Sequence, residues 1–309
     1  MELVMWSLLG ARGVEVLAWE SFGYRWALDI QNQLKLRNSR VIRAEYGELP
    51  NLSNVDFTSD VIFTWNGTTS GVRVPDGEWI SADRTGLTIV DATSALFSMY
   101  LPWDKIDVAT WSWQKALGGE AAHGMIALSP RALERLKIYV PPWPLPRLFC
   151  LINDGKINEK IFEGETINTP SMLAVEDVLD ALNWAKRVGG LQSLVSRTNQ
   201  NAQALKKWVN RTPWIKYLCA DNQARSPTSV VLVIIDPRYL RLNETVQRSL
   251  IKRLSEILAS ENVAFDIMSH RHAPPGLRIW CGSTIDVENL KILFPWLDWA
   301  FSEIMKPYQ

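Results

Sequence analysis

Short apolar runs alternate with helical stretches through the first half of the chain, and this pattern limits the possible folds more than any other feature. The runs are rich in Val, Ile and Leu and cover residues 14–18, 61–64, 87–90 and 125–128. Apolar strands of this kind are typical of a mainly parallel sheet that is covered on both faces. The sequence therefore predicts an α/β fold, in which ligands bind at the carboxyl ends of the strands.

The pattern changes after Gly190, where longer helices begin. Helices are predicted at residues 192–209 and 245–261, and strands at residues 229–235 and 277–281. This predicts a smaller α/β domain after the mainly parallel one. We place the large domain at residues 1–188 and the small domain at residues 189–309, with the substrate in the cleft between them.

Composition excludes several classes of protein. The chain has 309 residues, of which 47% are hydrophobic, so it can bury a large core. Its 33 basic and 33 acidic residues form no long run of one sign, which argues against nucleic acid or a membrane as partner. Cys150, Cys219 and Cys281 are too far apart for a common metal site or a disulfide framework. We expect a cytoplasmic protein that acts on a small polar metabolite and binds no metal.

Lys115 stands in an aromatic setting, in the sequence Trp-Ser-Trp-Gln-Lys-Ala-Leu-Gly-Gly that begins at Trp111. Removing an ammonium from water is costly, so such a lysine loses its proton, binds an anion or becomes a neutral imine. Asp91 follows the apolar run at 87–90. A carboxylate there suits the ring nitrogen of pyridoxal phosphate, an aldehyde cofactor that reacts with lysine. By spacing alone, a lysine that reaches solvent and an aspartate that caps a helix explain the same residues.

Two further segments could bind a phosphate. The run at 61–64 leads into Asn-Gly-Thr-Thr-Ser-Gly at residues 66–71, a turn rich in hydroxyl and amide groups. Farther on, Thr169 and Pro170 occupy the N-cap and first position of a predicted helix, which Gly189 and Gly190 end. An apolar face is predicted on this helix from Leu173, Val178, Leu179 and Leu182. An ordinary loop and an ordinary helix cap are the simpler readings of the two segments.

The stretch from Asn66 to Pro170 resembles the phosphoserine aminotransferases, which are class-V, fold-type I pyridoxal-phosphate enzymes. The lysine motif with its following Gly-Gly-Glu is similar to one branch of that family. The segment Ala-Pro-Pro-Gly-Leu-Arg-Ile-Trp-Cys-Gly at residues 273–282 resembles the family as well. The resemblance implies that the large domain binds pyridoxal 5'-phosphate.

The resemblance also implies roles for individual residues. Lys115 would be the Schiff-base lysine, and Asp91 would pair with the pyridine nitrogen. Thr68 and Gln114 would contact the cofactor, and Trp26 would stack on its ring. Phe22 and Tyr24 lie close to Trp26 in the sequence, and a core tryptophan is an equal alternative.

Other residues would serve the substrate and a second subunit. Asn168 and Thr169 would reach the phosphate of the cofactor in the neighbouring subunit, which implies a homodimer. Arg278 can bind a substrate carboxylate through two parallel hydrogen bonds. His270 and Arg271 add positive charge for a phosphorylated or dicarboxylic substrate, although a solvated polar turn also explains them.

The start of the chain differs from the family pattern. Members have an early Gly/Ser-rich turn that binds the cofactor phosphate, whereas residues 1–10 resemble the helix that follows this turn. The resemblance therefore implies a chain that lacks the N-terminal part of the pattern. We expect weaker binding of the cofactor phosphate, because part of its hydrogen-bond donors would be missing.

The sequence predicts a phosphoserine transaminase of serine biosynthesis. Such an enzyme transfers an amino group between glutamate and 3-phosphohydroxypyruvate, and gives O-phosphoserine and 2-oxoglutarate. Two alternatives remain: a noncatalytic or truncated relative that dimerises or binds a ligand, and another class-V enzyme such as a cysteine desulfurase. A desulfurase needs a mobile nucleophilic cysteine, but Cys281 lies in an apolar strand pattern that favours an inert thiol.

Overall fold

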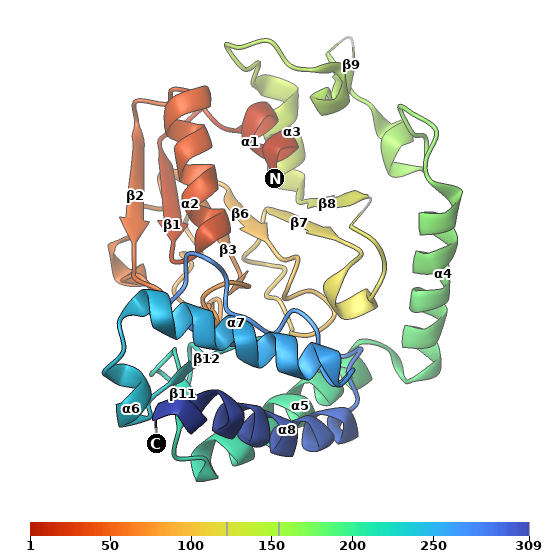
Figure 1. Ribbon diagram of the computed structural model, residues 1–309. Coiled ribbons are helices and arrows are strands. Elements are labelled where there is room, and N and C mark those ends of the chain that lie inside the picture. Colours follow the sequence, from red (N-terminus) through yellow and green to blue (C-terminus); the bar gives the residue numbers. More distant parts are fainter. Residues whose placement is uncertain (122, 154, 309) are drawn as a thin grey trace.

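A six-stranded sheet forms the centre of the N-terminal part of the molecule. The computed structural model describes residues 1–121, 123–153 and 155–308. The strands lie in the order β2-β1-β3-β6-β7-β8 (Figure 1). Their bounds are Val14–Ala18 for β1, Ser39–Arg43 for β2, Asp60–Thr64 for β3, Thr88–Asp91 for β6, Val108–Ser112 for β7 and Gly124–Leu128 for β8. Neighbouring strands run parallel from β2 to β7, and β8 runs antiparallel to β7.

This sheet confirms the predicted α/β class and all four predicted strands. The sequence pattern did not predict β2 or β7. Strand β2 is an edge strand whose residues are partly or fully exposed, so its Ser-Arg-Val-Ile-Arg sequence lacks a continuous apolar run. Strand β8 runs antiparallel to β7, and the described residues between them, 113–121 and 123, hold the short helical turn 115–117 and no crossover helix.

Two apolar layers cover the faces of this sheet. Helices α1 (Glu2–Leu8), α2 (Ser21–Leu28) and α3 (Pro130–Ile138) contribute to one layer. Segment 65–106 supplies most of the other layer, and it contains the short strands β4 (Asn66–Gly67) and β5 (Val72–Arg73). The sheet is thus held firmly on both sides, and its carboxyl edge faces the C-terminal part (Figure 1).

The C-terminal part has a three-stranded antiparallel sheet and its own apolar core. Its strands lie in the order β11-β12-β13. The elements are α5 (Gly190–Arg211), β11 (Ile215–Tyr217), β12 (Ser229–Ile234), α6 (Pro237–Leu240), α7 (Glu244–Ser260), β13 (Gly276–Trp280) and α8 (Val287–Met305). The predicted helices and strands of this region are confirmed to within a few residues. A core cluster confined to this part of the chain supports the small domain that we propose for residues 189–309.

Helix α4 (Met172–Arg187) differs from its predicted form in two ways. Its N-cap is Ser171, whose side chain accepts a hydrogen bond from the N–H of Ala174, so the prediction of Thr169 at this position was wrong. Pro170 therefore precedes the helix. Ser171 provides the capping hydroxyl because it stands immediately before Met172, the first helical residue. The predicted apolar face is only partly buried, because Leu173 and Leu179 are 69% and 46% exposed. Figure 1 shows α4 at one side of the molecule.

Short elements complete the chain. They are the strands β9 (Ile152–Asn153) and β10 (Lys156–Ile157), the π-helical turn η1 (Asp29–Gln33), and the 3-10 turns η2 (Leu52–Asn54), η3 (Lys115–Leu117), η4 (Arg147–Phe149), η5 (Glu159–Phe162) and η6 (Lys306–Tyr308). Among the helices of the described residues, none combines the length and the apolar character that a membrane crossing requires.

Candidate active site

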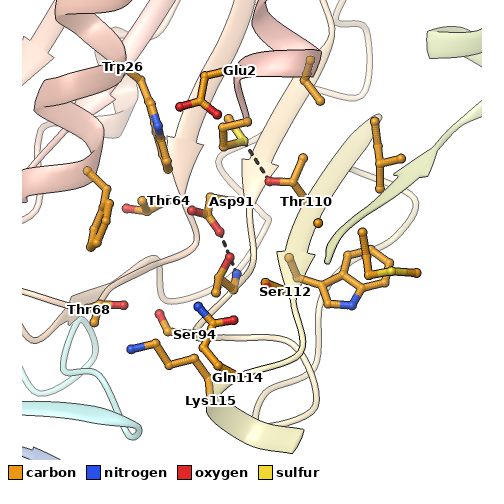
Figure 2. Close-up of a pocket in the computed structure, with 18 of the residues that line it drawn as sticks. Glu2, Trp26, Thr64, Thr68, Asp91, Ser94, Thr110, Ser112, Gln114 and Lys115 are labelled. Atoms are coloured by element: carbon orange, nitrogen blue, oxygen red, sulfur yellow. Dashed lines mark hydrogen bonds between the residues drawn. The ribbon is translucent and has the colours of Figure 1, made fainter. Parts of the chain in front are cut away.

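A cavity of about 450 Å³ lies at the carboxyl edge of the large sheet. Asp91 and Ser112 are the last residues of β6 and β7, and Asn66 follows β3. All three line the cavity, as do Thr68 and Lys115 (Figure 2). Parallel strands bring their carboxyl ends to one edge, so residues far apart in the sequence meet here.

Asp91 faces this cavity without a cationic partner. Its Oδ1 accepts a hydrogen bond of 2.7 Å from the N–H of Thr93. Among the described residues it forms no salt bridge. Burial raises the pKa of Asp91, although the hydrogen bonds from Thr93 oppose this shift. A half-buried carboxyl group of this kind is suited to a ligand that brings its own positive charge, such as a protonated ring nitrogen.

Lys115 lies in the tight turn η3 between β7 and β8. Its backbone φ is +71°, in the left-handed region that a non-glycine residue seldom adopts. Such strain is found at functional sites and costs about 1–3 kcal/mol. Figure 2 shows the Lys115 amine directed toward the side of the cavity where Thr68 and Ser94 lie.

The electrostatic setting of Lys115 favours a neutral amine. Burial lowers the pKa of Lys115, and the positive charge of Arg278 lowers it further, while Asp91 acts in the opposite direction. The Nζ atom also lies 5.6 Å from the centre of the Trp280 ring. A lysine with a lowered pKa has more unprotonated amine at neutral pH, and this form can attack a carbonyl carbon.

Several buried polar atoms of the cavity have no partner within the chain. Among the described residues, Asn66 Oδ1, Ser112 Oγ and Gln114 Oε1 are buried and accept no hydrogen bond. Leaving such groups unpaired costs about 1–3 kcal/mol each, so a polar ligand that donates to them would gain affinity. The Ser112 hydroxyl, which can donate to a phosphate or phenolate oxygen, and Asp91, which lacks a salt bridge, fit a polar aromatic cofactor such as pyridoxal phosphate.

Helix α2 forms the aromatic wall of the cavity. Trp26 and Phe22, four residues apart on this helix, both line the cavity, and Figure 2 shows Trp26 above Asp91. Trp26 is only 7% exposed and belongs to the core of the large sheet, whereas Phe22 is 41% exposed. Phe22 therefore offers more free ring surface than Trp26, and both remain candidates for stacking on a cofactor.

A second cavity, of about 580 Å³, adjoins the first at Thr68 and Lys115. Arg278 and Trp280 line it from β13, two residues apart and hence on the same face of the strand. Arg278 Nη2 lies 3.3 Å from Asp266 Oδ2, and Asp266 is exposed. Strand β13 thus brings the Arg278 guanidinium to a cavity that Lys115 also lines, and its role in binding substrate stays a prediction.

The other predicted substrate residues lie outside both cavities. His270 is partly buried, and its pKa is lowered by burial and by the charges of His272, Arg278 and Arg271. Arg271 is exposed in the same loop. Arg271 therefore adds positive charge to this loop, whereas the lowered pKa of His270 favours its neutral form. Neither residue lines the cavities that contain Lys115.

Asn168 and Thr169 are not brought to the cavity of their own chain. Both are exposed in the segment before α4, and neither lines the cavity around Lys115. Figure 1 shows α4 at the side of the molecule, away from the strands β1 and β2. The placement leaves the role of these residues at a neighbouring subunit as a prediction.

The sequence reasoning missed several cavity residues. Thr93 and Ser94 lie two and three residues after Asp91, and Ser112 is the last residue of β7, so hydroxyls at or just after a strand end were the signal that could have found them. Cys281, by contrast, is fully buried, and burial raises the pKa of its thiol to about 12. This thiol is not a nucleophile, which argues against a cysteine desulfurase.

Comparison with known proteins points to one family. No family model matches the chain. Phosphoserine aminotransferase from Methanosarcina mazei is 54% identical over 300 residues, which cover 97% of this chain and 78% of that protein. The protein of the same name from Methanosarcina barkeri is 54% identical over 97% of this chain and 79% of its own length.

Solved structures share the fold at much lower sequence identity. A phosphoserine aminotransferase from Cytophaga hutchinsonii matches with a TM-score of 0.77 and 18% identity, over 96% of this chain and 79% of that one. Alanine–glyoxylate aminotransferase from Nostoc sp. matches with a TM-score of 0.75 and 17% identity, over 97% and 78%. These likenesses show the fold of the pyridoxal-phosphate-dependent aminotransferases. Since the two Methanosarcina relatives share more than half of their aligned residues with it, the chain belongs to the phosphoserine aminotransferase family.

Proposed function

We propose that the chain is a phosphoserine transaminase, which transfers an amino group between glutamate and 3-phosphohydroxypyruvate to give O-phosphoserine and 2-oxoglutarate. One observation carries most of the weight: Lys115, with a lowered pKa, and Asp91 line one cavity, and Arg278 lines the adjoining cavity together with Lys115. The names of the relatives that are 54% identical support the same reaction.

Pyridoxal phosphate is the cofactor of this proposal. The group supplies an aldehyde carbon and a ring that withdraws electrons from the bonds of the substrate's α-carbon. Asp91 would hold a proton on the ring nitrogen, and Thr68 and Gln114 would hydrogen-bond its polar substituents. The aromatic wall of Phe22 and Trp26 would pack against one face of the ring and exclude water.

Lys115 has two tasks in the reaction. Its neutral amine would hold the cofactor through the aldehyde carbon, and when it is free Nζ would accept the proton from the substrate α-carbon and return a proton. The lowered pKa suits both tasks, because a base works best when its pKa is close to the pH of the reaction. The turn η3 fixes the backbone of Lys115, so only the methylene chain of the side chain can move.

Arg278 would orient the substrate through its carboxylate. A guanidinium forms two parallel hydrogen bonds with a carboxylate, and this pairing fixes the direction of the α-carbon bonds. In the loop before β13, Arg271 would add attraction for the substrate phosphate or the second carboxylate of glutamate, and a neutral His270 would add a hydrogen bond.

A homodimer in a reducing cytoplasm completes the proposal. In it, Asn168 and Thr169 would reach the cofactor phosphate of the partner subunit. The exposure of both residues, and of Leu173 and Leu179 on α4, supports a contact with a second copy. Three free cysteines agree with a reducing location.

An absorbance experiment tests the reaction. Purified protein is loaded with pyridoxal phosphate, its spectrum is recorded, and phosphoserine is added. We expect phosphoserine to convert the visible cofactor band to the band of the amine form, and 2-oxoglutarate to restore it. Serine is the control and should react far more slowly, since it lacks the phosphate. A loaded protein whose spectrum phosphoserine leaves unchanged would refute the proposed reaction.

A further inference from the structure

Glu20 is a fully buried acid at the start of helix α2. Its Oε1 accepts hydrogen bonds from the N–H groups of Phe22, at 2.7 Å, and Gly23, at 3.0 Å. This carboxyl group therefore caps the helix whose Phe22 and Trp26 form the aromatic wall of the cavity. Glu20 itself does not line the cavity.

The second carboxyl oxygen of Glu20 reaches across to the turn at residues 66–71. Thr69 Oγ1 donates a hydrogen bond of 2.9 Å to Glu20 Oε2 and accepts one of 3.2 Å from the N–H of Ser21. Thr69 is the neighbour of Thr68, which lines both cavities. Two hydrogen bonds thus join the start of α2 to the turn that carries Thr68.

Close packing makes this junction rigid. A Cβ atom at Gly67 would lie 2.5 Å from Ser70 Oγ, 2.8 Å from Trp19 Nε1 and 3.0 Å from Glu20 Cγ. Trp19 Nε1 also donates a hydrogen bond of 3.1 Å to the carbonyl oxygen of Val72. The turn therefore has little room to move relative to the end of β1 and the start of α2.

From these contacts we propose that Glu20 is a positioning residue for the cofactor: with Thr69 it clamps the turn that carries Thr68 to the helix that carries Phe22 and Trp26. The clamp sets the width of the cavity between the aromatic wall of Phe22 and Trp26 and the hydroxyl group of Thr68. This inference rests on the proposed function, since it assumes that the cavity binds pyridoxal phosphate.

Glu20 holds the clamp in both of its protonation states. Burial raises the pKa of Glu20 to about 7, and the negative charge of Asp91 also raises it. Lys115, Tyr46 and Tyr24 are the other titratable groups that interact with its charge. An ionised Glu20 accepts a hydrogen bond from the Thr69 hydroxyl, and a protonated Glu20 can donate one to Thr69 Oγ1 instead. The contact survives, but ionisation places a negative charge beside the site of an anionic cofactor.

Binding of pyridoxal phosphate to the cofactor-free protein tests the clamp without any measurement of turnover. We expect Thr69→Val and Glu20→Ala to raise the dissociation constant of pyridoxal phosphate about tenfold, because each leaves the other residue of the Glu20–Thr69 hydrogen bond buried without its partner. Thr69→Ser and Glu20→Gln are the matched controls, because each keeps a group that can complete the hydrogen bond. Both should bind within about threefold of the wild type at a pH below 6, where Glu20 is protonated.

The pH profile separates this role from a merely structural one. As Glu20 ionises between about pH 6 and 8, the dissociation constant of the wild type should rise relative to that of Glu20→Gln, which carries no charge. The clamp alone would be overturned if Thr69→Val binds pyridoxal phosphate as tightly as Thr69→Ser, or if Glu20→Ala binds it as tightly as Glu20→Gln. Identical pH profiles for the wild type and Glu20→Gln would overturn the effect of the Glu20 charge on the cofactor. A wild-type protein that binds no pyridoxal phosphate would overturn the proposed function and this role together.

Discussion

Lys115 and Asp91 are perturbed in opposite directions for one physical reason. Burial lowers the pKa of the lysine and raises the pKa of the carboxyl group, so each is driven toward its neutral form. A ligand with a positive ring nitrogen would offset the cost of keeping Asp91 ionised. A carbonyl carbon would react with the neutral amine of Lys115. The cavity is thus prepared for a molecule that carries both groups.

Arg278 allows a test at the level of a single side chain. Arg278→Lys keeps the positive charge but loses the two parallel hydrogen bonds that a guanidinium forms with a carboxylate. We expect kcat/KM for phosphoserine to fall about 100-fold, which corresponds to roughly 3 kcal/mol. Arg253→Lys, at an exposed position of α7, is the control and should leave kcat/KM unchanged. Equal kcat/KM values for Arg278→Lys and the wild type would exclude Arg278 from substrate binding.

Helix α4 leaves several large apolar side chains exposed. Val178 is buried, but Met172, Leu173 and Leu179 are exposed on a helix that has only one face against the molecule. Soluble monomers seldom leave such clusters in water, and a second copy of the chain would cover this one. The exposed segment with Asn168 and Thr169 leads directly into the same helix.

Charge placed on α4 should weaken the proposed homodimer. Leu173→Glu and Leu179→Glu would each bury an unpaired carboxylate in the interface, so we expect sedimentation to find more monomer for both variants than for the wild type. Ile292→Glu on α8 is the control, because Ile292 is 63% exposed and belongs to another surface. A wild-type protein that sediments as a monomer, or two α4 variants that remain fully dimeric, would contradict this interface.

The elements also show what the sequence could predict. Strands with continuous apolar runs and long amphipathic helices were predicted correctly, because burial alone dictates their pattern. Strand β2, with its exposed arginines, and the direction of β8 depend on pairing with other strands, which the local sequence does not record. The cap of α4 was placed two residues early, since Thr169 and Ser171 are both good capping residues and only the backbone selects one.

The site was predictable to the same extent. Lys115, Asp91 and Thr68 could be placed at the sheet edge because strand ends and motifs mark them in the sequence. Glu20 could not be found this way: its contact with Thr69 joins residues 49 positions apart. The pattern of the sequence likewise did not indicate that Trp280 lies beneath the Lys115 amine.

At the scale of the whole molecule, the C-terminal part holds the lysine turn in place. Ser283 Oγ donates a hydrogen bond of 3.1 Å to the carbonyl oxygen of Ala116, the residue after Lys115. Asn201 Nδ2, on α5, reaches the carbonyl oxygens of Cys281, Gly282 and Ile285 and so fixes the loop that contains Ser283. The position of the reactive lysine therefore depends on both parts of the chain.

Removing the Asn201 amide should loosen this connection. Asn201→Ala would leave buried carbonyl groups unpaired, so we expect the free energy of unfolding to fall by about 2 kcal/mol in urea denaturation. Asn210→Ala, at an exposed position near the end of the same helix, should change it by less than about 0.5 kcal/mol. If the two variants are equally stable, the amide of Asn201 does not hold the loop.

Whether Lys115 binds the cofactor is tested most directly by locating the bond. The protein is incubated with pyridoxal phosphate and reduced with borohydride, and the modified lysine is identified by peptide mass mapping. We expect the added mass on Lys115 and its absence from Lys115→Ala, while Lys105→Ala, which replaces another partly buried lysine, keeps the label. A label on a different lysine of the wild type, or a Lys115→Ala variant labelled to the same extent, would contradict the central role of Lys115.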